Sequence, residues 1–199
     1  MTGYQNFAKL FGTGRFIRSH EIKKKYSLKK ALSSVYIIPA FFRSIYYIPT
    51  AQERKGHFIQ HQQDFFTNLF NTRFGKNKWY WALSTAARYY GIEWSATKIL
   101  EIVIMEKSKT INLSEKITSY QQKTSYRSNL LADYYRSLDV NVIYMHKGEQ
   151  KSLSSIKIDG VLGPVCTKEQ LFRDVETYLS KTREENLKRI YQRILTQSK

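Results

Sequence analysis

The sequence predicts an α+β protein with two domains, and three observations indicate this class. Segments with a helical spacing of apolar residues alternate with short β-branched runs along the 199 residues. Hydrophobic residues make up 42% of the chain, which is enough to form a core and argues against general disorder. A polar stretch at residues 50–57 follows a strongly basic segment and resembles a linker. We therefore expect a small domain at residues 1–50 and a mixed α/β domain at residues 51–199.

The first fifty residues contain three expected helices. Residues 4–11 carry aromatic side chains at helical spacing and are followed by glycine. Ser19 is expected to cap a second helix over residues 20–25, and Ser27 a third over residues 28–32, because a serine hydroxyl accepts a hydrogen bond from a backbone N–H at a helix start. Two short helices joined by a few residues, the second flanked by lysines, form the plan of a helix-turn-helix.

Two β-prone runs follow these helices, and each ends at a proline. The runs are Val35–Pro39 and Ile45–Pro49, and a proline cannot donate to a sheet ladder. We expect them to form a compact β-wing that carries Arg43, which would make residues 1–50 a winged helix. The first run is also compatible with an extension of the third helix, which would leave a single strand.

The positive charge of the chain is concentrated in this N-terminal segment. Lysine and arginine number 33 against 16 acidic residues, which gives a net charge of +17. The first fifty residues contain nine of these cations and one glutamate. Such a segment attracts polyanions, because binding releases counterions from phosphates. We expect double-stranded DNA as the partner rather than a membrane surface, since the segment has no strong amphipathic face of Trp, Phe and Leu.

Seven residues are candidates for DNA contact: Lys23, Lys24, Lys25, Ser27, Lys29, Lys30 and Arg43. The region from Ser27 to Lys30 would enter the major groove, and the preceding lysines would contact phosphates. Lysine reads bases less well than arginine or asparagine, so these residues predict affinity more than specificity. A lysine run is also typical of a solvated helix face, and that alternative stays open.

The second domain is expected to be built around an aromatic helix that leads into a buried strand. This helix covers Trp79 to Tyr90 and ends before a glycine, and the strand covers Ile99 to Met105. The polar residues 107–127 are expected to form strands and loops. Other expected elements are a helix at 58–70, strands at 140–146 and 156–158, and two C-terminal helices with capping boxes at Thr167/Gln170 and Thr182/Glu185.

The sequence offers little for cofactor or covalent chemistry. Cys166 is the single cysteine, so it has no partner for an internal disulfide or a metal site. We expect no cofactor and no metal. The N-terminus does not resemble a signal peptide, and no window of about eighteen apolar residues occurs, so a cytoplasmic location without a membrane span is expected.

Three short motifs follow one another along the chain in an order that is familiar from one protein family. They are SIYYIP at Ser44–Pro49, YWALSTAARYYG at Tyr80–Gly91, and GPVCTKEQLFRD at Gly163–Asp174. Together with the basic N-terminal segment they resemble the AbiEi family of antitoxins and transcriptional regulators, over about residues 5–195. The resemblance implies a non-enzymatic repressor that binds inverted repeats in its own promoter through a winged helix. It also implies an antitoxin of a type IV toxin–antitoxin system, acting on a nucleotidyltransferase toxin, often without a stable complex.

The leading alternative is a metal-dependent nuclease of the restriction-endonuclease-like type. Asp139 precedes an expected strand, and Glu149 with Lys151 forms a Glu-x-Lys sequence. An acidic pair with a lysine can bind Mg²⁺ and activate water. Against this alternative, Glu149 falls in an expected turn rather than on a strand. A third hypothesis, an RNA-binding or toxin-binding module, also stays open.

Overall fold

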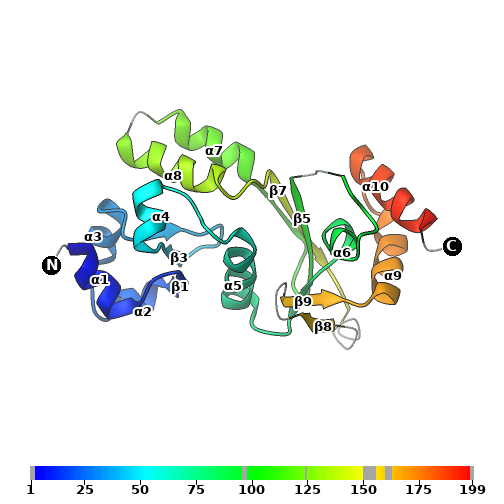
Figure 1. Ribbon diagram of the computed structural model, residues 1–199, viewed down its shortest axis with the longest axis horizontal. Coiled ribbons are helices and arrows are strands. Elements are labelled where there is room, and N and C mark those ends of the chain that lie inside the picture. The colour runs from blue at the N-terminus through cyan, green and yellow to red at the C-terminus, as the bar shows by residue number, and fades with distance from the viewer. Residues whose placement is uncertain (1–2, 96–97, 124, 150–155, 160–162, 198–199) are drawn as a thin grey trace. The chain divides into compact units, whose positions relative to one another are not determined.

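The protein is a mixed α+β protein, as the sequence predicts (Figure 1). A computed structural model describes residues 3–95, 98–123, 125–149, 156–159 and 163–197. The chain forms two compact units: unit 1 consists of Met1–Arg73 and Leu113–Asp139, and unit 2 of Phe74–Asn112 and Val140–Lys199. Residue 50, where the sequence predicts a boundary, therefore lies inside unit 1.

The N-terminal part of unit 1 contains three helices and a three-stranded antiparallel sheet. Its elements are α1 (Gly3–Phe11), β1 (Arg15–Arg18), α2 (Ser19–Lys23), α3 (Leu28–Ser33), β2 (Ile38–Pro39) and β3 (Ile45–Ile48). Strand β3 lies between β1 and β2 in the sheet. Phe7, Ile22, Ala31 and Ile48 are fully buried in one cluster, so each of the three helices contributes to the core beside the sheet.

The local signals in this part are mostly confirmed. Ser27 caps α3, and its hydroxyl accepts a hydrogen bond from the Lys30 N–H at 3.3 Å. Helix α2 begins at Ser19 itself, with Arg18 as its N-cap, so the predicted capping position is wrong by one residue. The third helix does not extend into the following run, because α3 ends at Ser33 and Val35 has a φ of 49°.

Four further helices complete unit 1: α4 (Ala51–Gly56), α5 (Gln62–Phe74), α7 (Leu113–Gln121) and α8 (Tyr126–Arg136). The expected linker at residues 50–57 is wrong, since Thr50 and Glu53 form a reciprocal capping box that starts α4. The expectation of strands and loops at residues 107–127 is confirmed at β6 (Lys109–Asn112) and wrong for residues 113–121. Most of that stretch is helical, and α7 and α8 lie side by side (Figure 1).

Aromatic rings connect the small sheet to the helices that follow it. Phe65 of α5 lies 4.9 Å from Phe16 and 5.0 Å from Tyr47, measured between ring centroids. Phe41 lies 5.5 Å from Tyr135 of α8. Such buried ring pairs contribute area and specific edge contacts. They explain why the compact unit continues beyond residue 50.

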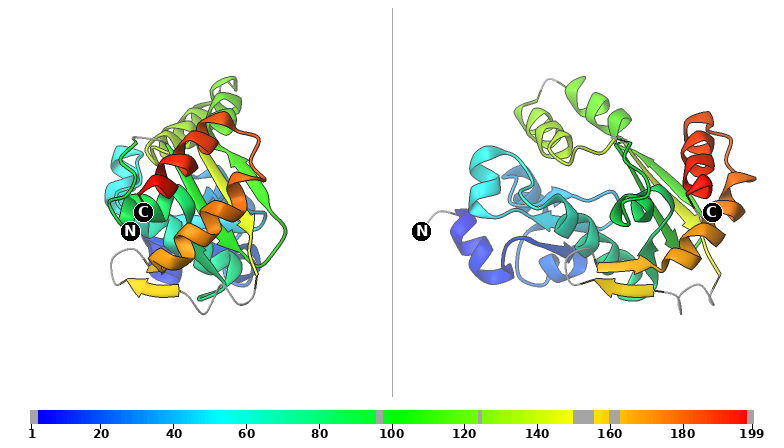
Figure 2. Two further views of the ribbon diagram at one scale, coloured as in Figure 1. Left: turned by 90° about the vertical axis from the view of Figure 1, so that its right-hand side faces the viewer. Right: turned by 45° about the vertical axis from the view of Figure 1, so that its right-hand side comes forward.

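Unit 2 is a mixed six-stranded sheet with three helices. Its elements are β4 (Trp79–Trp81), α6 (Leu83–Tyr89), β5 (Ile99–Ile104), β6 (Lys109–Asn112), β7 (Val142–Lys147), β8 (Ile156–Asp159), β9 (Gly163–Cys166), α9 (Lys168–Leu179) and α10 (Glu185–Thr196). The strand order is β6-β7-β5-β4-β9-β8, with β5 parallel to β7 and β4 parallel to β9. Helices α9 (orange) and α10 (red) pack against each other (Figure 2).

The aromatic segment is the main correction in unit 2. Trp79, Tyr80 and Trp81 form strand β4, and the helix begins only at Leu83. All three aromatic side chains are buried, which a central strand with both faces covered permits and a surface helix does not. The predicted strands at β5 and β7 are confirmed, whereas the Thr182 cap is wrong, since Glu184 is the N-cap of α10.

Candidate functional site

The seven residues predicted to contact DNA all belong to unit 1, and all are exposed. Lys23 ends α2, and Lys24 and Lys25 follow it in the turn. Ser27 caps α3, which carries Lys29 and Lys30. Arg43 lies in the turn between β2 and β3, and this turn contacts the start of α2, because the Ser19 N–H donates to the Ser44 carbonyl at 2.9 Å. We call these residues the basic face.

The lysines of the basic face are not neutralised by carboxylates. Between Glu21 and Glu53 the chain contains no acidic residue. Glu21 accepts from the Arg18 N–H at 3.0 Å, and the buried Glu53 accepts from Tyr47, Thr50 and Gln60. Among the residues that the structure describes, none of the six cations of the basic face forms an ion pair. The basic face therefore keeps its full positive potential for an external polyanion.

The turn that carries Arg43 is anchored by two phenylalanines. Phe41 and Phe42 are each 7% exposed, and Phe41 stacks on Phe66 at 6.3 Å. Arg43 and Ser44 remain exposed at the tip. Because the two phenylalanines anchor the turn, Arg43 extends from an ordered backbone rather than from a flexible loop.

The residues of the nuclease alternative do not form a described site. Asp139 is exposed at the end of unit 1, and Glu149 is exposed after β7 in unit 2. Lys151 lies outside the described residues. Within the described part of the chain, no group of three or more His, Cys, Asp or Glu residues is placed to hold a metal ion.

The single cysteine is unsuited to nucleophilic chemistry. Cys166 is fully buried at the end of β9. Burial raises the pKa of its thiol, and the nearby Asp174 carboxylate raises this pKa further. Because the thiolate is the reactive form, a raised pKa keeps this side chain inert.

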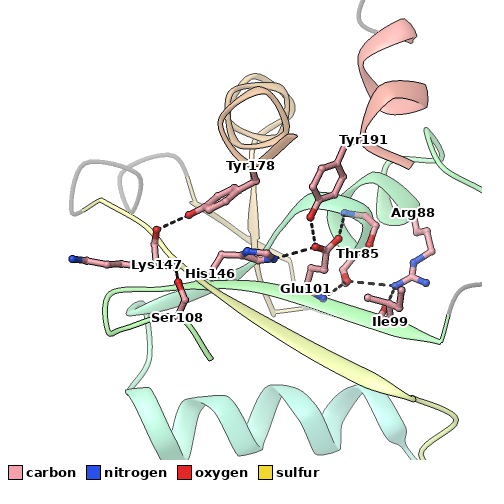
Figure 3. A network of polar contacts seen from close by, with 10 residues as sticks. Thr85, Arg88, Ile99, Glu101, Ser108, His146, Lys147, Tyr178 and Tyr191 are labelled. Atoms are coloured by element: carbon pink, nitrogen blue, oxygen red, sulfur yellow. Dashed lines mark hydrogen bonds and ion pairs between the residues drawn. The ribbon is translucent and has the colours of Figure 1, made fainter. Parts of the chain in front are cut away.

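A buried carboxylate in unit 2 was missed by the sequence reasoning (Figure 3). Glu101 of β5 is 0% exposed. Its Oε2 accepts from the Ser84 N–H at 3.0 Å, and its Oε1 accepts from the Tyr191 hydroxyl and lies 3.1 Å from His146 Nε2. These donors come from α6, α10 and β7, so one carboxylate connects three elements to β5. A glutamate in the middle of the apolar run ILEIVI was the available signal, because buried glutamates are almost always paired.

The groups around Glu101 hold it in a fixed environment. Thr85 Oγ1 accepts from the Glu101 backbone N–H at 2.8 Å. Burial and the Glu101 carboxylate raise the pKa of Tyr191, so its hydroxyl stays a hydrogen-bond donor. A carboxylate can orient a histidine as a general base. Here, however, the His146 ring packs 4.7 Å from the Tyr178 ring, and its side chain is 16% exposed. The network therefore fits a structural role in joining the sheet to its helices.

Comparisons with known proteins find no relative of this chain. No protein-family model matches it, and neither the curated proteins nor the solved structures contain a match. The resemblance to the AbiEi family therefore stays a prediction. Within the described ranges, no helix has the length and apolar character needed to cross a membrane.

Proposed function

We propose that this protein is a DNA-binding transcriptional regulator whose N-terminal part of unit 1 is a winged helix. The element order α1-β1-α2-α3-β2-β3, with β3 between β1 and β2, supports this proposal because it is the order of a winged helix-turn-helix. Helix α3 takes the place of the recognition helix, and the β2–β3 turn takes the place of the wing. The observation that carries the proposal is the basic face, whose exposed lysines lie on α2, the following turn and α3 and form no ion pair within the described structure.

The chemistry of the basic face favours phosphate contact over base reading. Lys23, Lys24, Lys25, Lys29, Lys30 and Arg43 are assigned to phosphates, and Ser27 and Lys29 also face the groove. If all six cations contacted phosphates, the plot of log affinity against log salt would have a slope of about −5. Helix α3 has six residues, so it presents few side chains to base edges. We expect a second copy or a second half-site to supply the remaining specificity.

The antitoxin role is a further part of the proposal and rests on the resemblance of the three motifs. In this role the protein would repress its own promoter and neutralise a nucleotidyltransferase toxin encoded beside it. Co-expression with that toxin tests the idea, and we expect the wild-type chain to restore growth. A variant with Lys23, Lys24 and Lys25 changed to glutamine separates the two activities, since it should lose repression and keep neutralisation. Growth arrest that persists with the wild-type chain would contradict the antitoxin role.

One set of binding measurements distinguishes the regulator hypothesis from the nuclease hypothesis. Fluorescence anisotropy compares the protein's own upstream DNA with a shuffled copy over a salt series. We expect tight binding of the native sequence that persists at about 150 mM salt and weaker binding of the shuffled one. Equal, steeply salt-dependent binding of both would exclude an operator-specific regulator. Mg²⁺-dependent cleavage that disappears in a variant with Asp139→Ala and Glu149→Ala would instead establish the nuclease.

A further inference from the structure

A cavity in unit 1 is lined in part by the C-terminal end of α3. Its volume is about 190 Å³, and its lining includes Ser33, Ser34, Arg54, His57, Arg127 and Tyr134. These side chains come from α3, α4, α8 and the residues that follow α3 and α4. Two arginines, a histidine and several hydroxyls face one space, and no carboxylate belongs to the lining.

Arg54 is held in place without a counter-ion. Its guanidinium donates a hydrogen bond to the Val35 carbonyl and lies 4.2 Å from the Tyr4 ring centroid. No ion pair with Arg54 occurs among the residues described. The neighbouring Glu53 does not neutralise it, because the Glu53 carboxylate is occupied by Tyr47 and by two backbone N–H groups. The guanidinium thus has hydrogen-bonding and cation–π partners but no carboxylate partner in the described structure, and a bound anion would supply the missing negative charge.

The other polar groups of the cavity are suited to an anion as well. Arg127 is exposed in the first turn of α8, and no carboxylate of the described chain pairs with it. The His57 ring packs edge-on against Tyr134 at 6.2 Å. Burial raises the pKa of Tyr134, so its phenol is neutral, and its hydroxyl donates to the Glu53 carbonyl at 3.3 Å. The cavity thus combines two guanidinium groups with an imidazole and serine and tyrosine side chains.

We propose that this cavity binds a small phosphorylated anion, with Arg54 and Arg127 as its phosphate ligands. Guanidinium groups match the geometry of phosphate oxygens and can bind them in a bidentate manner. The volume is below the roughly 300–1,000 Å³ of sites for drug-sized ligands, so it suits inorganic phosphate or a sugar phosphate. The shared chemistry is the phosphate group, which a free metabolite or a phosphodiester of bound DNA can supply.

The position of the cavity links it to the proposed function. Ser33 is the last residue of α3, Ser34 is its C-cap, and Arg54 holds the carbonyl of Val35, which has a positive φ. A β-branched residue is strained in this conformation, and the Arg54 hydrogen bond helps to hold it there. If unit 1 binds DNA as proposed, the ligand lies at the end of the same helix, α3, that carries Lys29 and Lys30.

Isothermal titration calorimetry with inorganic phosphate and ribose 5-phosphate, in a phosphate-free buffer, tests the site independently of DNA binding. We expect saturable binding to the wild-type chain and a Kd that rises about tenfold or more in Arg127→Gln, which lacks one charge-assisted contact. Arg136→Gln is the matched control, because Arg136 is exposed on the same helix and pairs with Asp133 instead. Its Kd should equal that of the wild type.

Two results would overturn the proposal. The first is a lack of saturable heat with either ligand, and the second is an equal loss of affinity in Arg127→Gln and Arg136→Gln. Thermal melting of both variants verifies that they are folded. The DNA affinity of Arg127→Gln, measured without added phosphate, identifies the source of the phosphate group. A DNA affinity equal to wild type assigns the cavity to a free metabolite, and a weaker one assigns it to a DNA phosphodiester.

Discussion

Replacing the lysine run after Ile22 with glutamine tests where the DNA phosphates lie. Lys23, Lys24 and Lys25 are exposed and have no ion pair within the described structure, so the change should leave the fold intact. Glutamine keeps a long polar stem and a similar helix propensity. Each lost phosphate contact lowers the steepness of the salt dependence by about 0.9, which gives up to about 2.7 for the three lysines. At about 150 mM salt this corresponds to roughly a fivefold loss of affinity per contact and about a hundredfold loss in total.

The assay is fluorescence anisotropy of a labelled duplex between about 50 and about 300 mM salt. The matched control changes Lys76, Lys78 and Lys107 to glutamine, which removes the same charge from exposed positions of unit 2. The control should keep both the wild-type slope and most of the affinity. If both triple variants lose the same slope, DNA is held by the total charge of the chain and the reasoning is refuted. Melting curves of the two variants show whether either change affects folding.

Three further predictions concern unit 2. Glu101→Gln places an amide among three donors, so chemical denaturation should show a loss of about 1–3 kcal/mol in the free energy of unfolding. The control is Glu185→Gln at an exposed position. Equal melting temperatures of the two variants would contradict the structural role of Glu101. Burial raises the pKa of Asp174, although hydrogen bonds from Gln170 and Tyr80 oppose this shift. The folded state therefore holds this proton more tightly than the unfolded chain, and the contribution to stability is lost as pH rises above about 3.9 through the raised pKa. Asp174→Asn should flatten the pH dependence of the unfolding free energy in that window, and an unchanged slope would argue against it. Cys166 should react with a thiol reagent only as fast as the chain unfolds, so rapid labelling of the folded protein would disprove its burial.

Local chemistry made much of the N-terminal part predictable. The Ser27 cap and the strand at Ile45–Ile48 both follow from short-range signals that the structure reproduces. The capping box of Thr50 and Glu53 was equally readable, yet the polar composition around it resembled a linker. Composition was misleading here because α4 is a short surface helix, and such helices need few apolar residues.

The features that the sequence did not predict depend on packing between residues far apart in the chain. Trp79 to Trp81 continue the helical spacing of the following segment, but their position between β5 and β9 makes them a strand. The buried role of Glu101 depends on Ser84, His146 and Tyr191, and the last two lie 45 and 90 residues away in sequence. The arginines of the cavity come from α4 and α8, which only the fold brings together. Such contacts leave no periodic signal in a single sequence.

NMR of the isotope-labelled protein, titrated with its own upstream duplex, tests the central claim most directly. The amide signals of residues 23–30 and of Arg43 and Ser44 should shift or broaden first, because these residues form the proposed DNA-binding surface. Signals of the buried Glu101 network should stay in place. If the largest changes instead occurred in β5, β7 and α10, with the residues of α2 and α3 unaffected, the assignment of DNA binding to the basic face would be wrong.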